Sequence, residues 1–225
     1  MDGAQEVKSR VELHEALHSL VEVNRILMED VEIAFAELDR DASNTALRTY
    51  IRAFFAQVEG SLFGLKQLAL LRHYHFPCLS EAEVLLLKEA SPEVDDKGRV
   101  TQRPKFVDTC ASVRFVSRIM LKTFALPEPA AFDFSIDGWS KFQDAVTIRN
   151  AVTHPKDATA LRISENDDGQ GYKVDCVATA AEWYGNEMGK LFDATLAAIR
   201  SIYITDAPGP ASEESSPNSP HACDK

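Results

Sequence analysis

A guanidinium, an amide and an imidazole lie close together in the segment 149–155, where Arg149, Asn150 and His154 precede Pro155. These groups can bind a phosphodiester and cleave it. Arginine holds two phosphate oxygens through paired hydrogen bonds, and histidine exchanges protons near neutral pH. RNA carries its own nucleophile, the 2′-hydroxyl, so cleavage without a metal needs a base, an acid and a group that stabilises the phosphorane. Asn150 would orient the phosphate, the ribose or the histidine.

The proline decides whether Arg149 and His154 can meet. In an uninterrupted helix, residues five apart point about 140° away from each other. The residue before a proline is pushed out of the helical region, so a helix that begins near residue 137 should end near residue 153. His154 is then free to turn, and we expect the two side chains to converge.

Arg149 interrupts the apolar face of this predicted helix. The face runs through Trp139, Phe142 and Val146, and Arg149 occupies its next position. An arginine turned toward a core requires a carboxylate or a bound anion, because leaving it unpaired costs several kcal/mol. The alternative is an arginine in a structural salt bridge inside a bundle and a histidine that only caps a helix.

Glu59 is the candidate partner for Arg149. It lies on the flank of a helix predicted over residues 45–73, aligned with Arg52 and Lys66 at seven-residue spacing. A carboxylate there would orient the guanidinium through a bidentate bond. The alternative is a row of salt bridges along an exposed helix edge, and the sequence leaves both open.

The motif Arg149-Asn150-x3-His154-Pro155, at the end of a helix in a helical chain, resembles the signature of the HEPN superfamily. The resemblance extends over about residues 11–204. It implies an all-α, HEPN-like bundle of five to six helices and a metal-independent endoribonuclease with Arg149, Asn150 and His154 as catalytic residues. It also implies a toxin or phage-defence role, a site shared across a homodimer, and a 2′,3′-cyclic phosphate product.

Two other functions remain open at this point. Some members of the superfamily have lost catalysis, so the same groups could belong to a non-catalytic module that binds a nucleotide or a protein. The chain could also be the toxin of a toxin-antitoxin pair whose antitoxin is encoded separately. The chain has no Gly-Ser followed by paired aspartates, so it does not encode such a nucleotidyltransferase-like partner itself.

Composition favours one soluble domain. The 225 residues are 45% hydrophobic and 26% charged, enough for a single core over residues 1–205. Residues 206–225 form an acidic tail rich in proline and serine, which we expect to be disordered. No apolar run approaches the roughly 18 residues of a membrane helix, and the N-terminus is not signal-like. We therefore expect a cytoplasmic protein without membrane contact.

Charge is unevenly distributed. The net charge of −11 argues against broad binding to nucleic acid. Residues 97–122, however, hold seven basic residues and one acidic residue, a local charge of +6. Arg114, Arg118 and Lys122 share the polar face of a predicted helix there and are candidate RNA contacts. A solvated helix face explains them equally well.

The remaining elements frame these candidates. Helical periodicity extends over residues 7–40, as one helix or two, and Ser43 or Asn44 should cap the helix at 45–73. Ser80 and Glu83 form a capping box for a short third helix. Further helices are expected over residues 104–124, starting at Pro104, and 178–203.

Two segments lack helical periodicity. Residues 91–103 are expected to form a loop or small hairpin. A β-hairpin insertion before the last helix is expected at residues 160–164 and 172–176, turning at 167–171.

Neither a metal nor a cofactor is expected. The four cysteines are widely spaced, and no metal-binding histidine motif or Gly-rich nucleotide loop occurs.

Overall fold

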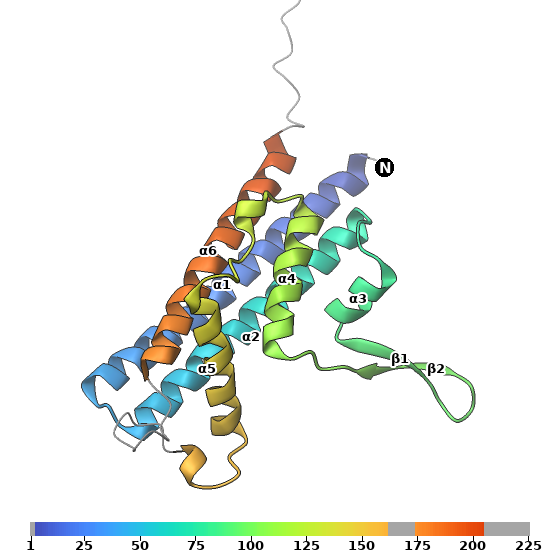
Figure 1. The fold of residues 1–225 in the computed structure, drawn as a ribbon. Coiled ribbons are helices and arrows are strands. Elements are labelled where there is room, and N and C mark those ends of the chain that lie inside the picture. Colours follow the sequence, from blue (N-terminus) through green and yellow to red (C-terminus); the bar gives the residue numbers. More distant parts are fainter. Residues whose placement is uncertain (1–2, 162–173, 205–225) are drawn as a thin grey trace, which may run out of the picture.

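The computed structural model describes residues 3–161 and 174–204, which form a helical bundle with one small hairpin (Figure 1). The elements in chain order are α1 (Gly3–Arg40), α2 (Asn44–His75), α3 (Glu81–Leu87), β1 (Ala90–Val94), β2 (Val100–Pro104), α4 (Thr109–Phe124), the 3-10 turn η1 (Glu128–Ala130), α5 (Asp137–Thr153), the 3-10 turn η2 (Thr159–Leu161) and α6 (Val174–Ile204). The prediction of a mainly helical bundle is confirmed.

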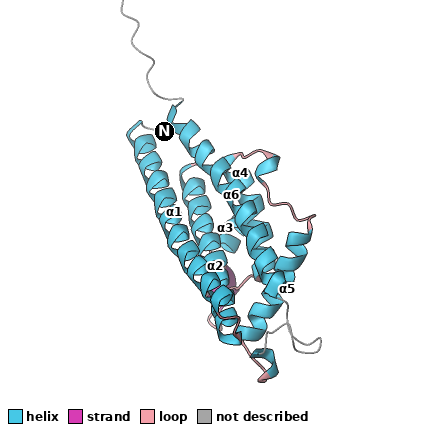
Figure 2. Ribbon diagram, turned by 90° about the vertical axis from the view of Figure 1, so that its left-hand side faces the viewer, coloured by secondary structure: helices cyan, strands magenta, loops and turns pink. Residues whose placement is uncertain are grey.

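Helix α2 lies at the centre of this bundle and contacts α1, α3, α4, α5 and α6. The long helices run along one another, with the start of α1 and the end of α6 at the same end (Figures 1 and 2). The C-terminal end of α5 lies at the opposite end. Ile51, Val58 and Leu65 of α2 are fully buried, and this apolar burial holds α2 in the bundle.

Residues 3–40 form one continuous helix, which resolves the choice between one helix and two. Its contact with α2 is close because Leu20 and Leu27 lie where Gly64 and Gly60 carry no side chain. The contact face is narrower than the apolar periodicity indicates. Val21, Ile26 and Phe35 remain about half exposed, while Leu13, Leu17, Leu20, Ala34 and Leu38 are buried.

Local capping sets several helix ends. The Ser43 hydroxyl accepts the N–H of Ala46, and the Ser80–Glu83 capping box is present. The prediction that Pro104 begins the fourth helix is wrong, because Pro104 is the last residue of β2. Helix α4 starts at Thr109. Its N-cap is Asp108, whose carboxylate accepts the N–H of Ala111 at 3.0 Å.

The small hairpin that was one of the two expectations for residues 91–103 is present. Strands β1 and β2 pair antiparallel within the segment expected to be a loop or small hairpin, and Gly98 turns between them with φ of +74°. The hairpin projects away from the bundle (Figure 1) and its residues are half-buried or exposed.

The hairpin expected before α6 is contradicted at both described ends. Residues 160 and 161 belong to η2, and residues 174–176 are already helical. Val177 and Ala180 are fully buried, so the buried face of α6 accounts for the helical start. The expected turn at 167–171 and the tail at 206–225 lie outside the described residues.

Helix α5 ends where the proline predicts. Its last residue is Thr153, and His154 has φ of −127° and ψ of 62°, outside the helical region. Its apolar face differs from the prediction, because the buried row continues through Ile148 and Val152, with Arg149 beside it. Arg149 therefore lies at the edge of the core. No helix in the described ranges is long and apolar enough to cross a membrane.

Candidate functional site

Arg149 is held between α5 and α2. One guanidinium nitrogen, Nη2, donates to Oε1 of Glu59, and Nη1 donates to Oδ1 of Asn150 at 3.2 Å. The guanidinium also lies 5.9 Å from the ring centre of Phe55, and the side chain is 25% exposed. The predicted contact with Glu59 is confirmed, but it uses one guanidinium nitrogen and is not bidentate. Nη1 is committed to Asn150 instead.

His154 does not join this group within the single chain. Its backbone N–H donates to the carbonyl of Asn150 at 2.9 Å and the residue is exposed. In residues 3–161 and 174–204, no hydrogen bond or ion pair connects its ring to Arg149. The expected convergence of the two side chains is therefore not present. The proline frees His154 from the helix, but the retained N–H bond keeps its backbone against the last turn.

Arg149, Asn150 and Glu59 line a cavity of about 510 Å³ between α2, α4, α5 and the residues that flank the hairpin. His154 is not part of its wall. The other lining residues combine charge with aromatic and aliphatic surface; they are Leu62, Phe63, Lys66, Glu89, Phe106, Val107, Asp108, Thr109, Ser112 and Val146.

Lys66 is the second cation of this cavity, and sequence analysis did not assign it to the site. Its side chain is 6% exposed, and Nζ donates to Oε1 of Glu89 at 2.6 Å and to Oγ of Ser112 at 3.1 Å. A buried ammonium requires such partners. The sequence feature that could have assigned Lys66 to the site is its seven-residue spacing from Glu59, which puts both residues on one face of α2. The partners were not predictable because they come from other elements.

Glu89 is held in an unusual backbone conformation. Its φ of +49° lies in the left-handed region, which a residue with a side chain rarely adopts. Its carbonyl accepts the N–H of Lys105 at 2.7 Å, just beyond the strand pairing. The conformation turns the chain from α3 into β1 and places the carboxylate beside Lys66. Such conformations gather at functional sites, where surrounding contacts maintain them.

The cavity wall carries a slight excess of negative charge. Lys66 and Arg149 supply two cations, whereas Glu59, Glu89 and Asp108 supply three carboxylates. Each cation is already paired with a carboxylate. An incoming phosphate would have to displace one of them.

The three candidate RNA contacts on α4 have different surroundings. The Arg114 guanidinium lies over the rings of Phe134 and Trp139, 4.6 Å from each ring centre. Lys122 is paired with Glu83. Arg118 is exposed and has no ion pair or hydrogen bond in the described part of the chain. All three line a second groove of about 510 Å³. Of these cations, Arg118 is therefore the one most available to an anion.

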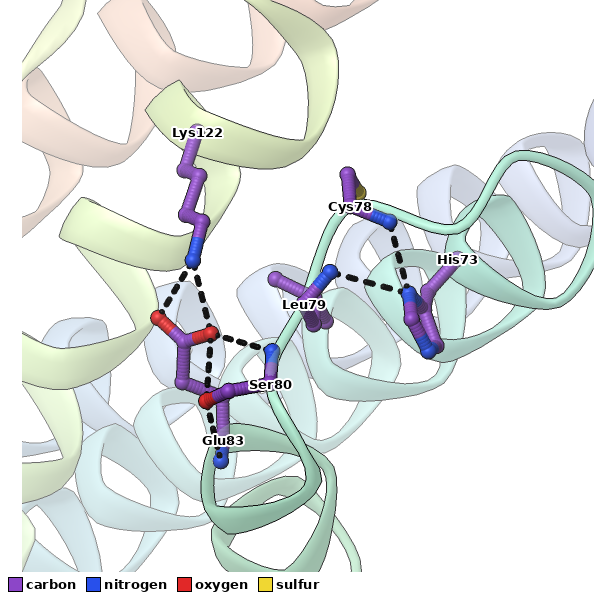
Figure 3. Close-up of polar contacts among 6 residues, drawn as sticks. All are labelled: His73, Cys78, Leu79, Ser80, Glu83 and Lys122. Carbon is purple, nitrogen blue, oxygen red and sulfur yellow. Dashed lines mark hydrogen bonds and ion pairs between the residues drawn. The ribbon is translucent and has the colours of Figure 1, made fainter.

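Glu83 connects α3 to α4. The Nζ of Lys122 donates to both its carboxylate oxygens at 2.7 and 2.8 Å, and the Ser80 N–H donates at 2.7 Å (Figure 3). The Lys122 hydrogen bonds, followed by the Ser80 N–H, lower the pKa of Glu83 from 4.5 to about 2. The stabilisation from this carboxylate is complete above pH 4.5 and disappears as pH falls from 4.5 toward 2.

Replacing Lys122 with methionine should raise the pKa of Glu83 toward 4.5, while the Ser80 hydrogen bonds keep it below that value. The pKa would be measured by NMR titration of the carboxyl carbon. Lys105→Met is the matched control, since Lys105 is exposed and outside this cluster. An unchanged pKa in Lys122→Met would show that the Lys122 contact does not persist in solution.

Histidines near the end of α2 have structural partners. His73 Nδ1 accepts the N–H groups of Cys78 and Leu79 at 3.0 Å each, which closes the turn into α3 (Figure 3). His75 is buried between Ser9 and Glu12. Within the described ranges, no group of three or more histidine, cysteine, aspartate or glutamate side chains is placed to hold a metal ion.

Comparisons with protein-family models, curated proteins and solved structures found no match for this chain.

Proposed function

We propose that the protein is a HEPN-like, metal-independent endoribonuclease. The observation that carries the proposal is Arg149, held by Glu59 and Asn150 at a cavity wall, one turn before a proline-terminated helix end that carries His154. The helical bundle and the Arg-Asn-x3-His-Pro motif support the same family. A toxin or phage-defence role follows from that resemblance.

The chemistry assigns one role to each group. Arg149 binds the non-bridging oxygens of the scissile phosphate and stabilises the phosphorane, after exchanging its bond to Glu59 for one to phosphate. His154 transfers one of the two protons, either taking it from the 2′-hydroxyl or giving it to the departing 5′-oxygen, and water transfers the other. The 2′-oxygen forms a bond to phosphorus as the bond to the 5′-oxygen breaks. The products are a 2′,3′-cyclic phosphate and a 5′-hydroxyl.

A second protein chain completes this site in the proposal. His154 lies outside the cavity that holds Arg149 of its own chain, so one chain alone does not bring the two groups to the same phosphate. A symmetric homodimer would bring the histidine of one subunit to the arginine of the other. Arg118, with Arg114 and Lys122, would hold the RNA strand along α4.

A mixing experiment tests this arrangement. Arg149→Ala and His154→Ala proteins, each inactive alone, should regain about a quarter of wild-type RNA cleavage when unfolded and refolded together. Half of the resulting dimers are mixed, and each mixed dimer keeps one intact arginine and histidine pair across its interface. Cleavage would be followed in EDTA, with the dimer mass measured by light scattering.

Arg40→Ala mixed with His18→Ala is the matched control, since both residues are exposed on α1. That mixture should have full activity, as should each of these proteins alone. A monomeric wild-type protein, or a mixture as inactive as its components, would contradict the shared site.

The second candidate is a non-catalytic module that binds a nucleotide or a protein. The observation that favours it is the pairing of both cavity cations with carboxylates, in a chain of net charge −11. Expression in a bacterial host separates the two functions. A nuclease should arrest growth and its His154→Ala variant should not, whereas a binding module should be tolerated in both forms. Growth arrest that is released by a co-expressed neighbouring gene would identify a separately encoded antitoxin.

A further inference from the structure

Two exposed aromatic side chains border the cavity that holds Arg149 and Lys66. Phe63 is 65% exposed and Phe106 is 88% exposed, and both belong to the cavity wall. Neither ring is needed by the hydrophobic core at that exposure. Exposed aromatic rings beside a cavity are typical of sites that bind a flat ligand.

We propose that this cavity binds a nucleobase and prefers bases that carry an amino group over uracil. That the base belongs to an RNA strand rests on the proposed function. The binding of a base in this cavity does not depend on whether the protein cleaves RNA. The volume of about 510 Å³ falls within the usual range for small-molecule sites.

The charges of the cavity favour a base over a phosphate. Both cations are engaged, Lys66 by Glu89 and Arg149 by Glu59, and the carboxylates outnumber the cations. A free phosphate would meet like charge and would have to break an ion pair with no other contact to offset the cost. In the proposed nuclease, the other contacts of the RNA strand offset that cost. A neutral base meets neither cost, and its faces can stack on Phe63 or Phe106.

The hydrogen-bonding groups left in the wall match an amino-bearing base edge. The side-chain hydrogen bonds of Glu59, Glu89 and Asp108 within the described residues each use one carboxylate oxygen. The second oxygen of each can therefore accept an N–H. Asn150 accepts from Arg149 through Oδ1, so its amide N–H groups can donate to a ring nitrogen or carbonyl. Cytosine, adenine and guanine each carry an exocyclic amino group with two N–H donors beside an acceptor. Uracil has one ring N–H donor between two carbonyls, and a carbonyl oxygen turned toward a carboxylate would be repelled.

The inner wall of the cavity is rigid. Lys66 is buried and bonded to both Glu89 and Ser112, which ties α2 to α4 and to the start of β1. Helix α4 also begins at this wall, where Asp108 caps it. A site built from fixed elements can discriminate between ligands by their hydrogen-bonding edges.

The test is calorimetric titration of the full chain with cytidine, adenosine, guanosine, uridine and ribose 5-phosphate. The three amino-bearing nucleosides should bind in saturable fashion, uridine should bind at least about threefold more weakly, and ribose 5-phosphate should not saturate. Phe106→Ala should weaken cytidine binding about tenfold, because it removes a stacking surface. Tyr74→Ala, which removes another exposed ring on α2 outside the cavity, should bind cytidine as the wild type does.

Any of four results would overturn the inference: no saturable nucleoside binding, uridine binding as tightly as cytidine, ribose 5-phosphate binding as tightly as the nucleosides, or cytidine binding that Phe106→Ala leaves unchanged. If single-stranded RNA competes with cytidine for the cavity, the natural ligand is a base within RNA. If nucleosides bind and RNA does not compete, the natural ligand is a free nucleoside. RNA cleavage without nucleoside binding defeats this inference alone. Nucleoside binding without cleavage defeats the nuclease proposal alone.

Discussion

Arg149→Ala and His154→Ala should each lower the rate of RNA cleavage in EDTA by about 10²- to 10⁴-fold. The arginine supplies charge to the phosphorane, and the histidine supplies the proton transfer. Both effects should appear in kcat, because they act in the transition state. Single-turnover cleavage of a labelled single-stranded RNA measures the rate, and analysis of the product ends identifies the 2′,3′-cyclic phosphate.

Controls for these variants must separate catalysis from folding. Arg149 joins α5 to α2 through Glu59, so its replacement removes a partly exposed ion pair. Such a pair contributes about 0–1 kcal/mol, and both variants should therefore unfold close to the wild-type urea midpoint. Arg40→Ala and His18→Ala should cleave RNA at the wild-type rate. Equal activity in wild type, Arg149→Ala and His154→Ala would exclude the nuclease proposal.

Phe142→Ala should destabilise the fold by about 3–5 kcal/mol, the largest stability effect expected here. Phe142 is fully buried in α5, stacked on Trp139 and Tyr184 with ring centres 5.7 Å apart in each case. It also meets Phe54 edge-on and Phe55 at a tilt. Removing the ring leaves a cavity where α2, α5 and α6 meet, and it loosens the helix that carries Arg149.

Urea unfolding followed by circular dichroism measures this effect. Phe106→Ala is the matched control, because the same ring is lost from a side chain that is 88% exposed. Its midpoint should stay close to the wild-type value. A shift of similar size in the two variants would mean that the aromatic cluster around Phe142 does not support the fold.

Features set by neighbouring residues were predictable from the sequence. The end of α5 at Thr153 follows from Pro155, and the start of α3 follows from the Ser80–Glu83 capping box. The helical start of residues 174–176 was missed, since its cause is burial of Val177 and Ala180 in the core. Proline favours the first position of a helix, so Pro104 was a plausible helix start. In the structure it is instead the last residue of β2, paired with Ala90 of β1.

The candidate site also has a part that was predictable from the sequence and a part that depends on tertiary contacts. The pairing of Arg149 with Glu59 was predictable in part, because a charge beside an apolar face requires a partner and Glu59 occupied a similar flank of α2. The cluster of Lys66, Glu89 and Ser112 was not predictable. Glu89 reaches Lys66 through a left-handed turn between α3 and β1, and the local residues do not specify it.

The sequence by itself determined that the chain is mainly helical, the caps at the starts of α2 and α3, and the proline-terminated end that carries Arg149 and His154, because such helix ends depend on side chains within about one turn. Only the tertiary structure decided which charges share a cavity. Those contacts join residues 23, 46 and 90 positions apart, and they exist because the packing of α2 against α4 and α5 brings them together. The same packing placed Arg149 beside the core and left His154 outside the cavity wall.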